Sequence, residues 1–301
     1  MTNIKDPKKY DVIGTRPLRP DGADKVTGRA LYGGDFEMSG LIYGKILRSP
    51  HAHARIKSIN FDKALKLEGV LAVVSADDLP GNPDGNISIS YKRGNILAKD
   101  KVLYVGHAVA AVAASDQHIA EEALELIEVE YEVLSASLSV EEAMDKNSEI
   151  IHENTFMKEF GEMTTVNNNI DEHFQHKNGD VDRGFEDADL IVDGKYSTVM
   201  VHQGYIEPHA ATALWKSDGT LTVWNSTQGS FPDRDELSTI LDIPISKIKV
   251  VPLEIGGGFG GKIPIYQEPV AALLSKKTGN PVKIIMTRKE VFESTGPTPG
   301  G

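Results

Sequence analysis

Short apolar stretches separated by turn residues dominate the first part of the chain and predict a small mixed sheet. These stretches are Leu41–Tyr43, Lys45–Leu47 and Val70–Val74. A brief helix is expected over 62–67, whereas 77–94 contains Pro-Gly and Asn-Pro-Asp-Gly breakers and is predicted to be loop. Residues 102–114 are nearly all Val, Ala and Gly, which is typical of a strand that is covered on both faces.

A helix and a further strand follow this buried segment. Ser115 is the expected N-cap, and apolar residues then recur at helical spacing up to Ile127. The alternation Val-Glu-Tyr-Glu-Val over 129–133 predicts a half-buried strand. With its own sheet, helix and core, this region is expected to form an independently stable domain that ends near residue 140.

A second block of periodic pattern opens near residue 188. The expected strands are 190–201, 210–215, 220–226, 249–255 and 282–286, and the expected helices are 230–241 and 268–277. Ser230-Phe-Pro-Asp233 has the pattern of a capping box, and Asp233 to Glu236 are expected on a solvated helix face. Gly279 and Pro281 end the second helix.

The regions between these blocks lack periodicity. Residues 1–20 are rich in Pro and charge and are expected to form an extended arm. Residues 141–185 are polar and weakly patterned, as an interdomain crossing would be. The predicted organisation is therefore an arm (1–20), a first domain (21–140), a crossing (141–185) and a second domain (186–301), with an α+β fold overall.

Composition narrows the possible functions. The 301 residues include 32 Lys and Arg against 44 Asp and Glu, a formal charge of −12, so nucleic acid is not an expected partner. The chain contains no cysteine, which excludes disulfides, Cys-ligated metals and Cys-held iron–sulfur clusters within it. It has no apolar stretch of membrane-spanning length, so we expect no membrane association and a cytoplasmic location.

The sequence Gly256–Lys262, GGGFGGK, is the strongest chemical signal in the chain. Five glycines around one aromatic residue let backbone N–H groups approach a ligand closely. A P-loop is disfavoured because Ile263 occupies the position of its Ser or Thr. A dinucleotide-binding loop remains open, with Glu290 as a late candidate for the acidic ribose partner, as does a loop that serves only a sharp backbone path.

This motif resembles the GGGFGGK signature of the molybdenum hydroxylases, the family of xanthine dehydrogenase, aldehyde oxidase and carbon monoxide dehydrogenase. Six further segments agree with their large subunits in the same order. They are Gly14–Asp35, Arg48–Ile56, Gly106–Ala114, Glu207-Pro208, Ser226–Gln228 and Glu268–Ala272. The resemblance covers most of the chain and is more specific than a single glycine loop.

The resemblance implies an α/β hammerhead domain followed by the first part of a mixed α/β molybdopterin-binding domain. It assigns cofactor binding to Gly257, Gly258, Phe259, Gly260 and Gly261, and the cofactor would be molybdopterin cytosine dinucleotide with molybdenum. Gln228 matches the glutamine that lies beside an oxygen ligand of the metal in that family, and it is the one catalytic candidate. An amide can donate a hydrogen bond there without adding charge.

The resemblance also implies an activity and a set of partners. The activity is oxidative hydroxylation of an N-heterocycle or an aldehyde at a C–H carbon, with oxygen derived from water. Xanthine-oxidising members have Glu directly after the signature lysine, where this chain has Ile263, and the family's general-base Glu lies beyond residue 301. Iron–sulfur and FAD subunits, and a separately encoded C-terminal half if the chain is split, are the expected partners.

Two other classes of function stay open at this point. The first is a nicotinamide-dependent dehydrogenase built on the Gly256 loop, and the second is a non-catalytic truncated or split assembly module. Direct metal ligation by His51 and His53, or by His202, Glu207 and His209, is weaker, because such residues in strands more often pack and hydrogen-bond. No residue of this chain is therefore predicted to ligate a metal.

Overall fold

The computed structural model describes residues 11–82, 84–153, 155–159, 162–166, 168–296 and 298–300. Its helices are α1 Gly22–Thr27, α2 Asp62–Leu65, α3 Ile87–Ile96, α4 Gln117–Glu125, α5 Val140–Met144, α6 Val181–Glu186, α7 Ser230–Leu241, α8 Glu268–Thr278 and α9 Arg288–Ser294, with short 3₁₀ turns η1 Gly33–Asp35, η2 Ala76–Asp78 and η3 Ile245–Lys247. Its strands are β1 Ile42–Arg48, β2 Ala54–Asn60, β3 Val70–Ser75, β4 Lys101–Val102, β5 Ala108–Ala114, β6 Glu128–Val133, β7 Thr155–Glu159, β8 Glu162–Val166, β9 Glu172–His173, β10 Ala210–Trp215, β11 Leu221–Asn225, β12 Ile248–Pro252 and β13 Val282–Ile285.

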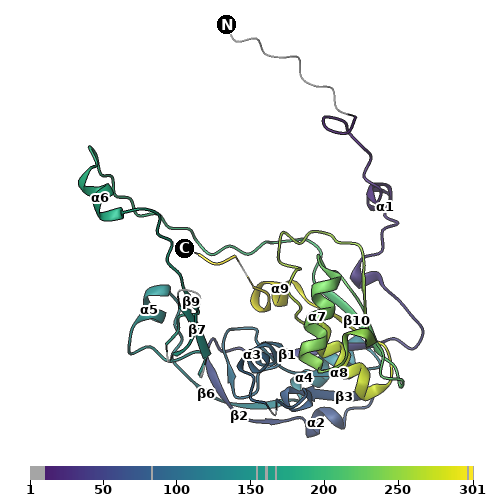
Figure 1. Cartoon of the computed structure of the whole chain (residues 1–301). Helices are drawn as coiled ribbons and strands as arrows, with labels where there is room; N and C mark the ends of the chain where they lie inside the picture. Colours follow the sequence, from purple (N-terminus) through teal and green to yellow (C-terminus); the bar gives the residue numbers. More distant parts are fainter. Residues whose placement is uncertain are drawn as a thin grey trace.

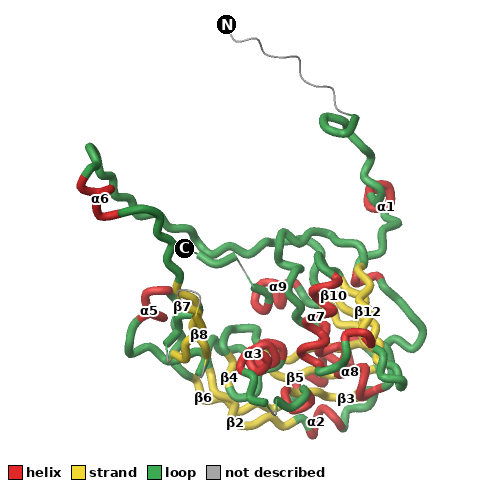
Figure 2. Tube along the Cα trace, in the orientation of Figure 1, coloured by secondary structure: helices red, strands yellow, loops and turns green. Residues whose placement is uncertain are grey.

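The main sheet has seven strands in the order β12-β11-β10-β13-β1-β5-β3 and lies at the centre of the body (Figures 1 and 2). Strands β13 and β1, which bring together the two halves of the sheet, pair in parallel, with Ile42 of β1 opposite Val282 of β13. Strands from the two predicted domains therefore form one sheet, and the largest core cluster includes Ile42, Ala111 and Leu237. The first region has buried clusters of its own, one that includes Val73 and Ala123 and one that includes Ala54 and Val102, and β1 also completes a sheet with the C-terminal strands. Its stability as a separate unit stays a prediction.

Strand β5 is buried along its whole length because helices cover both faces of the sheet. Ala111 and Ala113 share a cluster with the buried residues of α8, whereas Ala110 and Val112 share one with Ala123 of α4. Successive side chains of a strand point to opposite faces, so α8 and α4 lie on opposite sides. The prediction of a doubly covered strand is confirmed, although it starts at Ala108, after a turn that separates it from β4.

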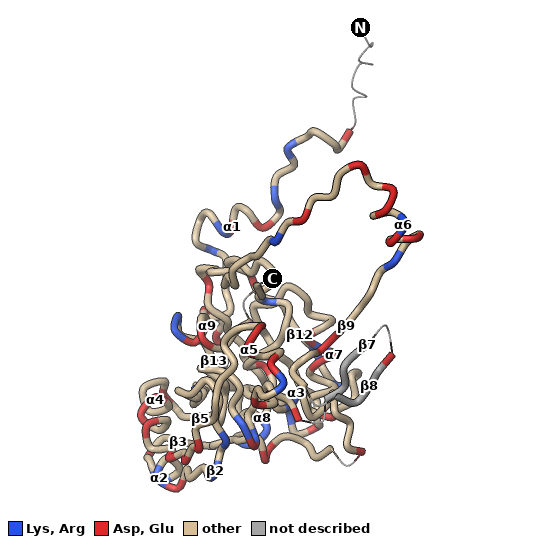
Figure 3. The backbone as a smooth tube through the Cα atoms, turned by 90° about the vertical axis from the view of Figure 1, so that its left-hand side faces the viewer, with Lys and Arg blue, Asp and Glu red and all other residues tan. Residues whose placement is uncertain are grey.

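Two smaller sheets stand beside the main one. Strands β4, β2 and β6 form the first, and β8, β7 and β9 form the second, which lies within the predicted crossing. The segment that follows carries α6 and stands away from the sheets, with acidic and basic residues interspersed (Figures 1 and 3). The strand predicted over 190–201 is wrong, because within it only Val201 forms a bridge, with Thr298.

Three helices begin differently from the prediction, and in two of them a polar side chain other than the expected one caps the helix. Helix α3 occupies part of the predicted 77–94 loop, and the side chain of Asn86 caps it by accepting from the N–H of Ile89. Asp116 rather than Ser115 caps α4. Gly229 precedes α7 without a side-chain cap, so the predicted capping box is wrong, and Asp233 is buried rather than solvated.

Several local predictions are confirmed. Helices α2 and α8 form where the periodicity places them, and Gly279 ends α8 in the left-handed conformation with φ +70°. The β10–β11 hairpin turns at Gly219, with φ +81°. Among the described residues, we find no helix whose length and apolar character would let it cross a membrane.

Candidate cofactor-binding site

The glycine loop after β12 follows a path that most side chains would prevent. Gly257 and Gly260 have φ values of +103° and +90°, and Phe259 between them is also left-handed at +53°. A Cβ atom on Gly258 would lie 2.4 Å from the side-chain oxygen of Gln228. This path leaves the side chain of Phe259 75% exposed at the tip of the loop.

Gln228 fastens this loop to the end of β11. Its side-chain oxygen Oε1 accepts hydrogen bonds from the N–H groups of Gly260 at 3.1 Å and Lys262 at 3.2 Å. Its own backbone N–H donates to the carbonyl of Lys262 at 2.9 Å. The residue is exposed, and its amide nitrogen forms no hydrogen bond within the described part of the chain, so both amide N–H donors face outward.

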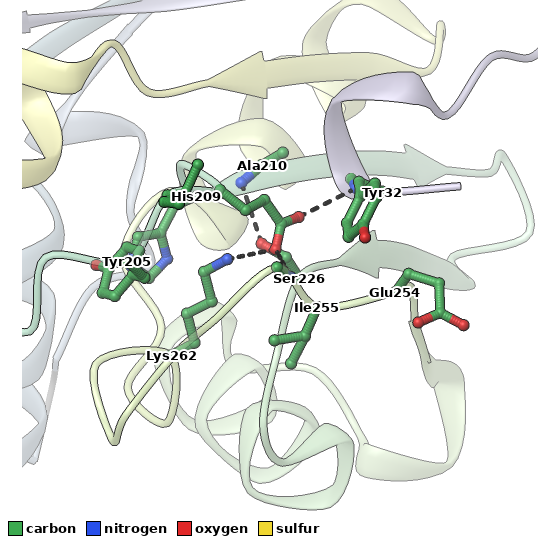
Figure 4. Close-up of polar contacts among 12 residues, drawn as sticks. Tyr32, Tyr205, His209, Ala210, Ser226, Glu254, Ile255 and Lys262 are labelled. Atoms are coloured by element: carbon green, nitrogen blue, oxygen red, sulfur yellow. Dashed lines mark hydrogen bonds and ion pairs between the residues drawn. The ribbon is translucent and has the colours of Figure 1, made fainter. Parts of the chain in front are cut away.

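Glu207 holds the other end of the loop, and Figure 4 labels Lys262, whose ammonium group it binds. Its Oε2 accepts from the N–H of Gly256 and from the Lys262 ammonium, each at 2.6 Å. Its Oε1 accepts from the N–H of Gly33 at 3.4 Å. A Cβ on Gly256 would lie 2.7 Å from the Cβ of Glu207, so only glycine allows the carboxylate this close. One carboxylate therefore joins the loop to the N-terminal region of the chain.

Lys262 is turned inward, away from any ligand. It is only 1% exposed, pairs with Glu207 and lies with its ammonium nitrogen 5.1 Å from the centre of the Tyr205 ring. Burial lowers its pKa, while the hydrogen bond and charge of Glu207 act in the opposite direction. A P-loop lysine must reach phosphate, so this geometry argues against that reading as firmly as Ile263 does.

Three of the histidines considered as metal ligands lie within hydrogen-bond distance of other groups of the protein. His209 Nε2 lies 2.6 Å from the Tyr205 hydroxyl, and His202 Nε2 lies 2.9 Å from Thr295 Oγ1. Burial lowers the pKa of His209 to about 3, with the Lys262 charge as the next cause. His53 Nδ1 lies 2.8 Å from the carbonyl of Ser135. Within the described ranges no group of three or more acidic, His or Cys side chains could hold a metal.

The arrangement also disfavours a dinucleotide-binding unit. In such a unit the glycine loop opens directly into a helix and the two flanking strands are neighbours. Here α8 starts only at Glu268, and β11 and β10 separate β12 from β13. Glu290, the candidate ribose partner, binds Arg48 at 2.8 Å and caps α9 through Thr287. Its carboxylate is thus already committed to the fold.

The loop surface has what an extended polar cofactor would need. In the part of the chain described, the N–H groups of Gly257, Gly258 and Phe259 form no hydrogen bond, and a Cβ on Gly260 would meet open space. Together with the two amide N–H donors of Gln228, these groups make a set of neutral donors close in the loop and its support. Such donors suit an anionic or oxygen-rich group, so the residues present are compatible with a molybdopterin.

The sequence pattern offered Gln228 and the glycine loop as candidates but not the residues that hold them in place. Glu207 was considered only as a metal ligand, whereas it positions the loop. Arg288, which donates to the carbonyl of Tyr205 at 2.7 Å, carried no sequence signal. For Glu207, the match of Glu207-Pro208 to the family pattern was the available signal.

Comparisons with known proteins agree with this geometry. The family profile described as "Molybdopterin cofactor-binding domain" matches residues 162–300, and "Aldehyde oxidase and xanthine dehydrogenase, a/b hammerhead domain" matches 27–135. The chain is 42% identical to a probable xanthine dehydrogenase subunit of Bacillus subtilis over 92% of this chain and 35% of that protein. It is 35% identical to "Nicotinate dehydrogenase large molybdopterin subunit" of Eubacterium barkeri, over 94% and 63%.

Solved structures show the same likeness. Quinoline 2-oxidoreductase from Pseudomonas putida 86 matches with a TM-score of 0.76 at 30% identity, covering 94% of this chain and 36% of that one. Carbon monoxide dehydrogenase from Oligotropha carboxidovorans matches with a TM-score of 0.78 at 30% identity, covering 95% and 36%. The chain thus spans roughly a third of these two structures and of the Bacillus relative, and just under two thirds of the Eubacterium one.

Proposed function

Since the chain belongs to the molybdenum hydroxylase family of molybdopterin-binding large subunits, we propose that its glycine loop and Gln228 hold one side of a molybdenum cofactor. The observation that carries this proposal is the set of N–H donors of Gly257, Gly258, Phe259 and the Gln228 amide that have no hydrogen-bond partner among the described residues. Gly260 turns the loop with its positive φ, and Gly261 lets the loop pack against the Tyr205 ring, where a Cβ would not fit. The proposed form of the cofactor is molybdopterin cytosine dinucleotide.

The residues of this chain would bind and orient rather than react. The Gln228 oxygen is already used to hold the loop, so its amide nitrogen points outward in one fixed direction. A neutral amide orients an oxygen-rich group without changing the charge of the site. The exposed ring of Phe259 would shield the cofactor from water. When bound, the cofactor supplies two-electron oxidation of a substrate carbon with oxygen from water.

The proposed substrate class is an N-heterocycle, with an aldehyde as the second possibility. Nicotinate and quinoline, which appear in the names of two relatives, are aromatic N-heterocycles. Ile263, which follows the signature lysine, is half exposed and apolar, so this position offers no carboxylate to a purine. The proposal therefore favours a ring with a large apolar edge over xanthine.

The proposed assembly includes further polypeptide. Electrons must leave the cofactor, and these 301 residues contain no cysteine to ligate an iron–sulfur cluster. We therefore assign that role to an iron–sulfur subunit and an FAD subunit, in the cytoplasm. The sequence that the longer relatives have beyond the matched region would supply the opposite wall of the cofactor site and the general base.

Substitution of Gln228 tests the proposal in the assembled enzyme. Gln228→Ala removes the outward amide, and turnover at full molybdenum occupancy is expected to fall by about 10²-fold. Gln117→Ala on the exposed face of α4 is the matched control and should leave turnover unchanged. Equal turnover in wild type and Gln228→Ala would contradict the assignment.

Cofactor analysis separates the alternatives. Molybdenum and pterin that co-purify with the assembled enzyme support the proposal. Protection of the loop by a nicotinamide nucleotide, without molybdenum, would instead support a dehydrogenase. An assembly with neither cofactor would support a non-catalytic module.

A further inference from the structure

A buried polar cluster flanks the short segment that carries Gln228. It consists of Asn225 at the end of β11, Asp233 in the first turn of α7 and Glu268 at the start of α8, and none of the three is more than 4% exposed. The Asn225 amide nitrogen donates to Asp233 Oδ2 at 2.7 Å and to Glu268 Oε1 at 3.0 Å. One amide therefore joins two carboxyl groups from two helices.

Two residues of the cluster, Asn225 and Asp233, lie on either side of the short segment that carries Gln228. Residues 226–229 connect Asn225 to the start of α7, and the N–H of Asp233 donates to the carbonyl of Gly229. Within this segment, the Thr227 hydroxyl accepts from the N–H of Gly229 at 2.9 Å and donates to the carbonyl of Lys262 at 3.4 Å. Movement of Asp233 relative to Asn225 would therefore move both ends of the segment.

The two carboxyl groups are supported unequally. Glu268 accepts a second hydrogen bond, from the N–H of Tyr266 at 2.9 Å. Asp233 Oδ1 and Asn225 Oδ1 are buried and have no hydrogen-bond partner in the part of the chain that the structure describes. Two ionised carboxylates so close together in a buried place repel each other, and the one with fewer donors takes up a proton first. That carboxyl group is Asp233.

The electrostatic surroundings agree with this geometry. Burial raises the pKa of Asp233 to about 7, and the charge of Glu268 is the next cause, while the hydrogen bond from Asn225 acts in the opposite direction. The remaining charged group that acts on it among the described residues is Glu236, also on α7. Glu236 is itself paired with Lys92 of α3 at 2.6 Å.

We propose that Asp233 is a positioning residue for Gln228: in its neutral form it holds the 226–229 segment in place, and its ionisation beside Glu268 loosens that segment and the hydrogen bonds from Gln228 to the glycine loop. Its relevance to catalysis rests on the proposed function, but the conformational coupling does not. Asp233 touches neither the loop nor the outward amide, so it acts only through the segment.

Hydrogen exchange of the purified 301-residue chain tests the coupling without any cofactor. The measured quantity is the protection factor of the Gly260 and Lys262 amides, which donate to Gln228, corrected for the intrinsic exchange rate at each pH. In the wild type we expect protection to fall about tenfold between pH 6 and pH 8. Asp233→Asn keeps the shape of the neutral carboxyl group and should reduce that fall to less than threefold.

Two further variants keep the test decisive. Glu268→Gln removes the neighbouring charge and should also reduce the fall to less than threefold. Asp235→Asn, on the exposed side of α7, is the control and should behave as the wild type does. Protection that does not depend on pH in the wild type, or a tenfold fall that persists in Asp233→Asn or in Glu268→Gln, overturns the proposal.

The assembled enzyme gives an independent readout. Asp233→Asn should keep its molybdenum content and KM while extending the plateau of kcat to higher pH, whereas Asp235→Asn should not. An unchanged kcat profile in Asp233→Asn would overturn the catalytic part of the inference. Absence of molybdenum from the wild-type assembly would instead overturn the proposed function and leave the exchange result standing.

Discussion

The carboxylate of Glu207 lies 2.6 Å from the ammonium nitrogen of Lys262, and neither side chain is more than 10% exposed. An ion pair this deeply buried is weak evidence of net stability, because both charges lose their hydration. Its evident structural effect is geometric: the same carboxylate oxygen also accepts from the N–H of Gly256, so the pair fixes where the glycine loop begins.

Breaking this pair from one side should be costly. Glu207→Gln leaves the Lys262 charge buried without a counter-charge, and we expect the free energy of unfolding to fall by about 3–5 kcal/mol. Lys262→Met should cost a similar amount, and the double variant should lose clearly less than the sum of the two. Denaturant titrations measure all three variants. Additive losses would show that the two charges are not coupled.

The exposed pair of Lys57 and Glu132 offers a matched control. Both side chains are about half exposed, so Lys57→Met should change the denaturation midpoint little.

Gly258→Ala should disorder the loop without unfolding the protein. The added Cβ would lie 2.4 Å from Gln228 Oε1, so the glutamine must leave the amides of Gly260 and Lys262. We expect exchange at these two amides to become at least tenfold faster, and the proposed cofactor binding to be lost. Gly81→Ala, where a Cβ would meet open space, should show neither effect. Unchanged exchange in Gly258→Ala would mean that the loop can shift as a unit.

Acid should destabilise the protein through His209. Burial lowers the pKa of this histidine to about 3, whereas an unfolded histidine has a pKa of about 6.5. Between these values the unfolded chain binds a proton that the folded chain does not, so stability falls as the pH falls. The contribution reaches about 1.4 kcal/mol per pH unit.

Replacing His209 should therefore flatten the acid limb of the stability curve. In His209→Gln the free energy of unfolding should depend less steeply on pH between 4 and 6, while the exposed His118→Gln should keep the wild-type slope. Unfolding measured at several pH values compares the three proteins. The same slope in His209→Gln as in the wild type would refute this account.

Limited proteolysis should nick the chain without separating its parts. The residues from 171 to about 201 are mostly exposed and lie outside the sheets apart from β9, so cleavage is expected there. Because β1 pairs with both β5 and β13, the two fragments should remain associated in gel filtration. Survival of an N-terminal fragment alone would show that the first region folds independently.

The strength of local signals explains which elements the sequence could predict. The periodicity of α8, its glycine stop and the apolar run of β5 are local. The bounds of α8 were predicted to within one residue, whereas β5 was predicted to start six residues too early, because the apolar pattern does not show the turn that separates it from β4. Helix α3 was missed because its apolar periodicity is weak and a contact with a distant segment helps to hold it. Its buried Arg93 donates to the carbonyl of Ile240 at 2.9 Å. Leu190 to Met200 have a strand-like composition, but none of these described residues is in a strand.

The site was predicted in the same uneven way. Gln228 and the glycine loop belong to continuous motifs, so the resemblance offered them as candidates directly, and their role stays a prediction. The supports come from distant segments, such as Gly33 with Glu207 or Asn225 with Glu268, and no spacing rule brings those pairs together. Asp233 was predicted to be solvated because its neighbours are charged. Its burial follows from the packing of α7 against β12 and α8.

The pairing of β1 with β13 also limits how early the main sheet can close while the protein is being synthesised. Strand β1 can pair with β13 only after Val282, the partner of Ile42, has been synthesised about 240 residues later. At roughly 5–20 residues per second, the ribosome needs about 10–50 s to deliver it. During that interval the edge of β1 is an unpaired template on a nascent chain. Slower translation of the last hundred residues should therefore raise the fraction of chains that aggregate before the sheet closes.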